Sequence, residues 1–156
     1  MPLPVGSAVP DRSLPALDAP PAPLSAAWAA GEALLLVGHS DCRTTRLALP
    51  CVDLIHRRRA AGTTVVALMQ DTPEAARALV AELGLDLPVR LEADPYPLAA
   101  ALDVRVVPTL FAVARDGRVT AVAEAFDKQA LEELAARFGA GPLFEPGDTR
   151  PARRPG

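Results

Sequence analysis

Two short apolar segments separated by a long helical pattern constrain the fold of this chain most strongly. Leu34–Gly38 is uniformly apolar and predicts a buried strand. A helical pattern follows from about residue 41 to 61, and Thr64–Met69 predicts a second strand, β-branched at its start. A strand, a long helix and a parallel strand form a βαβ unit, whose crossover is right-handed. The sequence therefore predicts an α/β protein with a parallel pair of strands in its sheet.

The rest of the chain continues the alternation and adds antiparallel strands. Thr72 and Pro73 provide a capping hydroxyl and a first-turn proline, and so predict a helix start. Asp116 and Gly117 predict a hairpin turn. The further predicted elements are a strand at Leu87–Leu91, a short helix at Pro97–Leu102, strands at Thr109–Ala114 and Arg118–Ala123, and a last helix capped by Asp127. We therefore expect a mixed central β-sheet flanked by helices on both faces.

Proline and glycine mark the boundaries of this domain. Residues 1–25 hold seven prolines, which exclude a helix and predict an extended arm with short edge strands near Ser13–Leu17. Residues 26–138 carry the alternating strands and helices. Residues 139–156 are rich in Gly, Pro and Arg, so we expect a flexible C-terminal tail.

Composition excludes several classes of function. The net charge of −3 and the lack of aromatic residues among the basic ones argue against nucleic acid as a partner. The sequence holds no apolar run long enough to span a membrane, and no signal peptide is visible, so we expect a cytoplasmic protein. Two cysteines and two histidines lack the spacing of metal ligands, and no cofactor motif is present. The oligomeric state is not indicated.

Cys42 is the strongest candidate for a reactive residue in this sequence. It lies where the first buried strand gives way to the long helix, at the positive end of the helix dipole. Unpaired N–H groups there favour the thiolate, which is the reactive form. Asp41 opposes ionisation, whereas Arg43 favours it. The position predicts thiol redox chemistry.

Three segments, in this order, resemble parts of the thioredoxin superfamily. Gly6–Asp18 resembles the entry segment of TlpA/ResA-like thiol-disulfide reductases and of AhpC/TSA peroxiredoxin-type proteins. Leu24-Ser25 resembles the second strand of their N-terminal β-hairpin, and Asp103–Phe111 resembles their cis-proline segment. The resemblance covers roughly residues 10–138 and implies a thioredoxin-like fold with an N-terminal β-hairpin extension.

The resemblance also implies a substrate-binding segment. In that fold the proline before the third strand is cis and packs beside the redox cysteine, which implies these features for Pro108. The backbone of Val107 would then pair with an extended substrate, with Thr109 following it. An edge-strand proline without a role in binding is the alternative for Pro108.

The main departure from the reductases concerns the second active-site cysteine. These families carry Cys-x-x-Cys, whereas this chain has Cys42-Arg43-Thr44-Thr45, so Thr45 stands where the resolving cysteine belongs. Cys51 is a possible resolving thiol, but nine helical residues span roughly 13.5 Å. A disulfide needs Cα atoms within about 7 Å, so the helix would have to unwind. Cys51 also fits the apolar stripe of the helix as a core residue.

Three functions remain open from the sequence. The first is thiol-disulfide exchange through the single nucleophile Cys42, with protein or small-molecule thiols and disulfides as partners. The second is a one-cysteine peroxidase acting on peroxide, for which His39 could act as a base, although it could equally be a loop histidine bonded to backbone. The third is a redox-inactive binding module. The Thr44 and Thr45 hydroxyls could donate hydrogen bonds to a thiolate in either enzyme, or could be ordinary first-turn residues.

Overall fold

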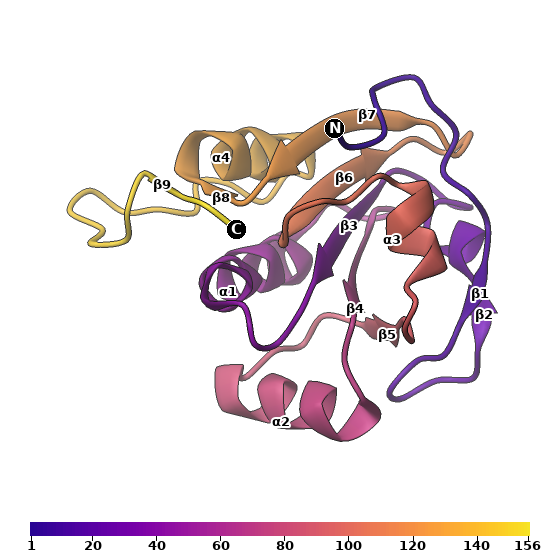
Figure 1. Cartoon of the computed structure of the whole chain (residues 1–156). Coiled ribbons are helices and arrows are strands. Elements are labelled where there is room, and N and C mark those ends of the chain that lie inside the picture. The colour runs from indigo at the N-terminus through magenta and orange to yellow at the C-terminus, as the bar shows by residue number, and fades with distance from the viewer.

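The computed structural model describes residues 1–156 and shows an α/β fold (Figure 1). The strands are β1 (Ser13–Leu14), β2 (Ala22–Pro23), β3 (Ala33–Gly38), β4 (Thr64–Met69), β5 (Val89–Leu91), β6 (Thr109–Val113), β7 (Val119–Glu124), β8 (Phe126–Asp127) and β9 (Arg153–Arg154). The helices are α1 (Arg43–Arg58), α2 (Pro73–Leu83), α3 (Pro97–Ala101) and α4 (Lys128–Arg137), with a 3₁₀ turn, η1, at Leu24–Ala27.

The central sheet has five strands in the order β5-β4-β3-β6-β7. β3 pairs in parallel with β4 and antiparallel with β6, so it lies in the middle of a mixed sheet. Every residue of β3 is buried, which explains its uniformly apolar sequence. This confirms the predicted fold class, and β1 and β2 form the N-terminal hairpin.

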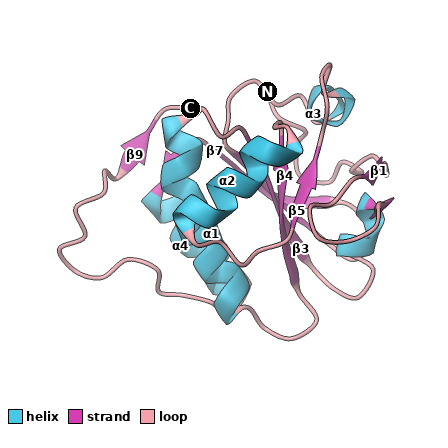
Figure 2. Ribbon diagram, turned by 90° about the horizontal axis from the view of Figure 1, so that it is seen from below, coloured by secondary structure: helices cyan, strands magenta, loops and turns pink.

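Both faces of the sheet are covered. On one face, α1, α2 and α4 pack on Leu34 and Leu36, in a cluster of 24 buried residues. On the other, α3, η1 and the N-terminal arm pack on Leu35 and Val37, in a cluster of 15. The alternation of neighbouring residues between the two faces follows from the period of two in a strand. Figure 2 shows the helices gathered around the sheet.

Helix ends follow local signals in the sequence. Thr72 caps α2 by accepting a hydrogen bond from the Ala75 N–H at 3.2 Å, and Asp127 caps α4 through the Ala130 N–H at 3.2 Å. Both side chains satisfy N–H groups that have no partner inside the helix.

No helix is both long and apolar enough to traverse a membrane.

The second strand of the hairpin differs from its expected position. It comprises Ala22–Pro23, whereas Leu24 and Ser25 lie in η1. The carboxylate of Asp11 accepts hydrogen bonds from the N–H and the hydroxyl of Ser25, at 2.9 and 2.6 Å. These bonds hold the chain in a turn at the point where the resemblance placed a strand.

The C-terminal segment, for which we expected a flexible tail, lies against the domain. Leu143 is buried in the larger core cluster, and Phe144 packs edge-on to Phe126. Arg153–Arg154 pairs with β8 as strand β9. The aromatic and arginine side chains of this segment supply contacts that its proline and glycine content did not reveal.

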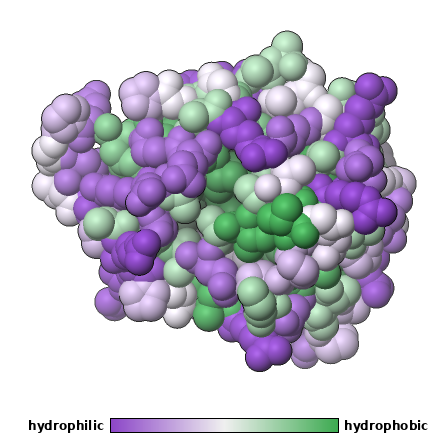
Figure 3. Space-filling view, turned by 90° about the horizontal axis from the view of Figure 1, so that it is seen from above, coloured by the Kyte–Doolittle hydropathy of each residue, from purple (hydrophilic) through white to green (hydrophobic).

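Outside these contacts the surface is mostly hydrophilic. Met1 and Val5 are the only large apolar side chains that are exposed. On the face shown in Figure 3, the most strongly hydrophobic residues gather near the centre, and further hydrophobic groups lie among the hydrophilic residues around them. Nearly all of the large apolar side chains are therefore at least partly buried.

Candidate functional site

Cys42 is the N-cap residue of α1. Its backbone is extended, with φ −84° and ψ 117°, and its Sγ accepts a hydrogen bond from the Thr45 N–H at 3.4 Å. The sulfur thus occupies the place that an Asp or Ser oxygen takes in an ordinary cap. A negative charge on it would lie at the positive end of the helix dipole, as the sequence predicted.

The segment around Pro108 lies next to this sulfur. The Cys42 thiol donates to the Val107 carbonyl, with 3.3 Å between Sγ and the oxygen. The Val107–Pro108 peptide bond is cis, and Pro108 is buried. Thr109 is also buried, and its hydroxyl donates to the Val106 carbonyl at 2.8 Å. The structure therefore brings Cys42 and the proposed substrate-binding segment together across 65 residues of sequence.

The pKa of Cys42 is lowered from the ordinary value of a cysteine. Partial burial acts against ionisation and is the largest single influence. Hydrogen bonds from the hydroxyl and N–H of Thr45, and smaller ones from Thr44, favour the thiolate and together outweigh burial. The Asp41 side chain is 92% exposed, so water screens its opposition. The hydrogen bonds from the first turn of α1 therefore decide the direction in which the pKa of Cys42 moves.

Thr45 is fully buried beside Cys42. Its hydroxyl oxygen has no hydrogen-bond partner in the neutral state of the site, yet it lies near enough to the sulfur to lower its pKa. A hydroxyl can rotate to donate to a thiolate when one forms. Gly38 makes room for this side chain, since a Cβ at Gly38 would lie 2.7 Å from Thr45 Cγ2. Thr45 therefore places a potential hydrogen-bond donor beside the Cys42 sulfur.

The loop before Cys42 is held by a buried carboxylate that the sequence analysis did not single out. Asp71, two residues beyond the end of β4, has a buried side chain and accepts hydrogen bonds from the Ser40 N–H and, at 2.5 Å, from the Ser40 hydroxyl. Arg46 donates to the Ser40 carbonyl at 2.7 Å. The order of the strands was a usable signal, because the carboxyl ends of β3 and β4 lie at the same edge of the sheet.

The imidazole ring of His39 interacts with residues that hold this loop. Its Nδ1 accepts a hydrogen bond from the Asp41 N–H at 3.0 Å, and its Nε2 lies 3.9 Å from Asp71. Only its backbone carbonyl bonds to Cys42, by accepting from the Cys42 N–H at 3.1 Å. The ring therefore acts as a structural group of the loop in this state, rather than as a base on the sulfur.

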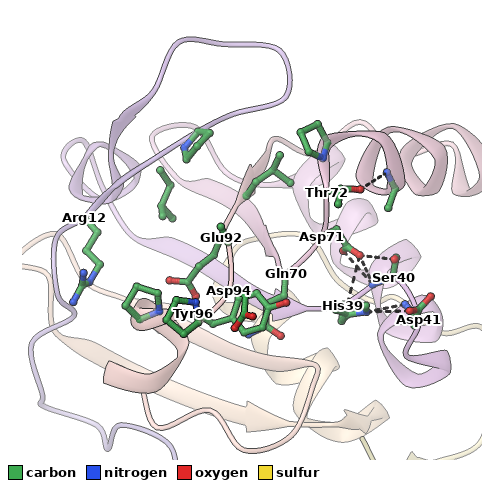
Figure 4. Close-up of a pocket in the computed structure, with 18 of the residues that line it drawn as sticks. Arg12, His39, Ser40, Asp41, Gln70, Asp71, Thr72, Glu92, Asp94 and Tyr96 are labelled. Carbon is green, nitrogen blue, oxygen red and sulfur yellow. Dashed lines mark hydrogen bonds and ion pairs between the residues drawn. The ribbon is translucent and has the colours of Figure 1, made fainter.

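A cavity of about 1070 Å³ opens behind the same loop. It lies at the carboxyl ends of β3, β4 and β5, between the N-terminal arm and the segment that leads to α3 (Figure 4). Asp71 and His39 line one side, and Glu92 and Tyr96 the other. Glu92 is buried and caps α3, accepting from the Leu98 and Ala99 N–H groups at 2.5 and 3.0 Å. Cys42 is not among the lining residues.

Cys51 is not brought to Cys42. Both cysteines are free, and α1 runs without interruption from Arg43 to Arg58 with Cys51 inside it. Cys51 is buried, its thiol lies 3.8 Å from the Leu47 carbonyl, and Arg150 approaches its sulfur at 3.2 Å. Burial raises the pKa of Cys51, so its thiol is held in the unreactive form.

Comparison with known proteins gives similarity at the level of fold. No protein-family model matches the sequence, and no curated protein sequence matches it significantly. Among solved structures, a candidate thiol:disulfide interchange protein DsbE from Chlorobium tepidum is similar, with a TM-score of 0.77, 23% identity, and coverage of 89% of this chain and 99% of that one.

Two further structures give the same result. A thiol-disulfide oxidoreductase from Bacteroides fragilis has a TM-score of 0.74 at 16% identity, covering 84% of this chain and 98% of that one. A thiol-disulfide isomerase from Corynebacterium glutamicum has a TM-score of 0.72 at 16% identity, with coverage of 87% and 97%. These likenesses establish the thioredoxin-like fold.

Alkylation of Cys42 in the folded protein is expected to show a lower pH midpoint than alkylation of the same cysteine in the urea-unfolded chain, because folding lowers the pKa of Cys42. The matched variant Thr45→Val removes the hydroxyl at nearly constant shape and should move the midpoint upward. The rate of iodoacetamide labelling against pH, with Cys51→Ser as background, measures both. A midpoint at or above that of an unfolded cysteine would contradict the prediction.

The lowered pKa of Cys42 also determines how the stability of the fold changes with pH. Because the folded-state pKa of Cys42 is the lower one, its contribution is fully present above the unfolded pKa and is lost as pH falls through the folded pKa. Urea unfolding across that window should therefore show stability of the wild type rising with pH relative to Cys42→Ser.

Proposed function

We propose that this protein carries out thiol-disulfide exchange with Cys42 as its single working thiol. The observation that carries the proposal is the position of Cys42 Sγ, bonded to the first turn of α1 and 3.3 Å from the Val107 carbonyl. The similar structures include a thiol-disulfide oxidoreductase and a thiol-disulfide isomerase, which supports the same chemistry.

The proposed step balances without a further redox agent. The Cys42 thiolate attacks one sulfur of a disulfide R–S–S–R′, a Cys42–S–S–R bond forms, and R′–S⁻ leaves. A second thiol from solution then attacks the mixed disulfide and regenerates Cys42. Thr45 cannot supply that thiol, and Cys51 lies too far along α1. The partners are therefore proteins or small molecules that carry a thiol or a disulfide.

A mixed disulfide should accumulate on Cys42 when the folded protein meets a small disulfide in the absence of free thiol. Intact mass after incubation with oxidised glutathione should show one adduct in the wild type and in Cys51→Ser, and none in Cys42→Ser. The expected rate rises with pH through the folded pKa of Cys42. An adduct that persists in Cys42→Ser, or none in the wild type, would sink the proposal.

The same variants test the two other functions suggested by the sequence. Consumption of peroxide that depends on Cys42, without a stable mixed disulfide, would support a peroxidase. A Cys42 inert to both reagents would leave a binding module. The geometry favours exchange, because the ring nitrogens of His39 are directed to Asp41 and Asp71.

A further inference from the structure

The last six residues, Pro151–Gly156, lie across the proposed site. Figure 1 shows the C-terminal end of the chain between β8 and the start of α1, and Figure 2 shows β9 on the outer side of the same region. These residues follow a segment that leaves the domain after α4 and returns to it. The C-terminal end of the chain thus lies beside Thr44 and Val107, the residues that contact or flank Cys42.

The segment binds as an extended strand. Arg153 and Arg154 pair antiparallel with Asp127 and Phe126, and the Lys128 N–H donates to the Ala152 carbonyl at 2.9 Å. Arg153 also makes an ion pair with Asp127, with Nε 3.1 Å from Oδ2. Since Oδ1 of this carboxylate caps α4, its position is fixed from the other side. The pairing therefore selects an extended backbone and a basic side chain.

The end of the segment contacts Thr44 and Val107, which both lie beside the Cys42 sulfur. The Thr44 hydroxyl donates to the Pro155 carbonyl at 2.5 Å and accepts from Arg154 Nε at 3.2 Å. Gly156 packs on the Val107 carbonyl so closely that a Cβ there would overlap it. This is the carbonyl that the Cys42 thiol faces. A partner approaching Cys42 along Val107 would meet the segment first.

An anchor upstream holds the segment without taking part in the site. Asp148 makes ion pairs with Arg150 at 2.6 Å and Lys128 at 3.0 Å, and both cations lie over the Phe144 ring. Hydrogen bonds from Arg150, and then Lys128, lower the pKa of Asp148. Residues 151–156 are all exposed, so their release uncovers little apolar surface while the anchor stays in place.

We propose that Thr44, Val107 and β8 form a binding surface for an extended, basic peptide segment, and that residues 151–156 occupy it in the free protein. Backbone pairing with β8 accounts for the extended form, and Asp127 accounts for the basic side chain. The inference goes beyond thiol-disulfide exchange, because it concerns access to Cys42 and holds whatever chemistry Cys42 performs.

Deletion of residues 151–156 is the direct test. The plateau rate of Cys42 alkylation, measured above the midpoint of its pH profile, should rise at least about tenfold, the protection expected from a segment that is docked nine-tenths of the time. The double variant Arg153→Glu/Arg154→Glu in the full chain should also raise the plateau rate of Cys42 alkylation. Arg77→Ala/Arg115→Ala, which removes two exposed arginines elsewhere, should leave the rate unchanged.

Addition of the segment in trans tests the surface itself. A synthetic peptide of residues 151–156 at about millimolar concentration, the range set by a short flexible tether, should slow alkylation of the deletion variant again. The same peptide with glutamate at both arginine positions should not. An unchanged plateau rate after deletion overturns the proposal, and so does a peptide without effect. Because alkylation needs no disulfide exchange, failure of the proposed function would leave this result untouched.

Discussion

Replacement of Thr45 by cysteine is expected to shorten the lifetime of a mixed disulfide on Cys42 by about a hundredfold or more, because an intramolecular thiol replaces one that must arrive from solution. The introduced thiolate would attack Cys42 Sγ, form an intramolecular disulfide and release the bound thiol. Under the proposed function, the wild type would hold the mixed disulfide until an external thiol reached it. Stopped-flow detection of the released thiol measures the difference.

The geometry around Thr45 supports this expectation. Its N–H already lies 3.4 Å from the Cys42 sulfur, and residues three apart on a helix are neighbours within the range of Cα distances that a disulfide spans. Cysteine is close to threonine in size. The buried Thr45 hydroxyl has no hydrogen-bond partner, so the substitution removes no hydrogen bond.

Thr45→Val is the matched control for this substitution. It keeps the shape of the side chain without a thiol, so its mixed disulfide should persist at least as long as in the wild type. A mixed disulfide equally long-lived in Thr45→Cys would mean that position 45 does not face the sulfur during the reaction, contrary to the structure.

Asp53→Ala is expected to lower the free energy of unfolding by about 3 kcal/mol, since it leaves buried N–H groups without the charged acceptor they use now. Asp53 Oδ1 accepts from the Asp86 and Leu87 N–H groups, both at 2.8 Å, and Oδ2 accepts from Arg57 at 2.7 Å. The carboxylate is buried and ties α1 to the loop before β5. Urea unfolding followed by circular dichroism measures the loss.

Two variants define the cause of that loss. Asp53→Asn keeps an oxygen for the two N–H groups and should cost about 1 kcal/mol. Glu82→Ala removes a surface carboxylate paired with Arg46 and should cost less than about 1 kcal/mol, as exposed ion pairs do. If Asp53→Ala cost no more than Glu82→Ala, the buried hydrogen bonds would not be the source of stability.

The fold was predictable from the sequence where the signals are local. The burial of β3 follows from its uniformly apolar residues, and the starts of α2 and α4 follow from the caps Thr72 and Asp127. Leu24 and Ser25 were assigned to a strand, but Asp11, fourteen residues before Ser25, holds them in a turn. A hydrogen bond of that range has no periodic signature in the sequence.

The candidate site was predictable in its centre and not in its surroundings. The position of Cys42 at a helix start follows from local pattern, and its approach to Val107 follows the expectation drawn from resemblance. The support of Ser40 by Asp71 depends on which strands are neighbours. The contact of Pro155 with Thr44 joins residues 111 positions apart through a proline-rich segment, whose composition favours disorder.

The Thr44 hydroxyl has one hydrogen and two acceptors that compete for it. In the structure this hydrogen goes to the Pro155 carbonyl, whereas an ionised Cys42 would also draw on Thr44. Docking of the C-terminal segment and ionisation of Cys42 are therefore thermodynamically linked through a shared proton donor. Linkage is reciprocal, so whatever releases the segment frees a donor for the thiolate, and formation of the thiolate weakens the hold on the segment.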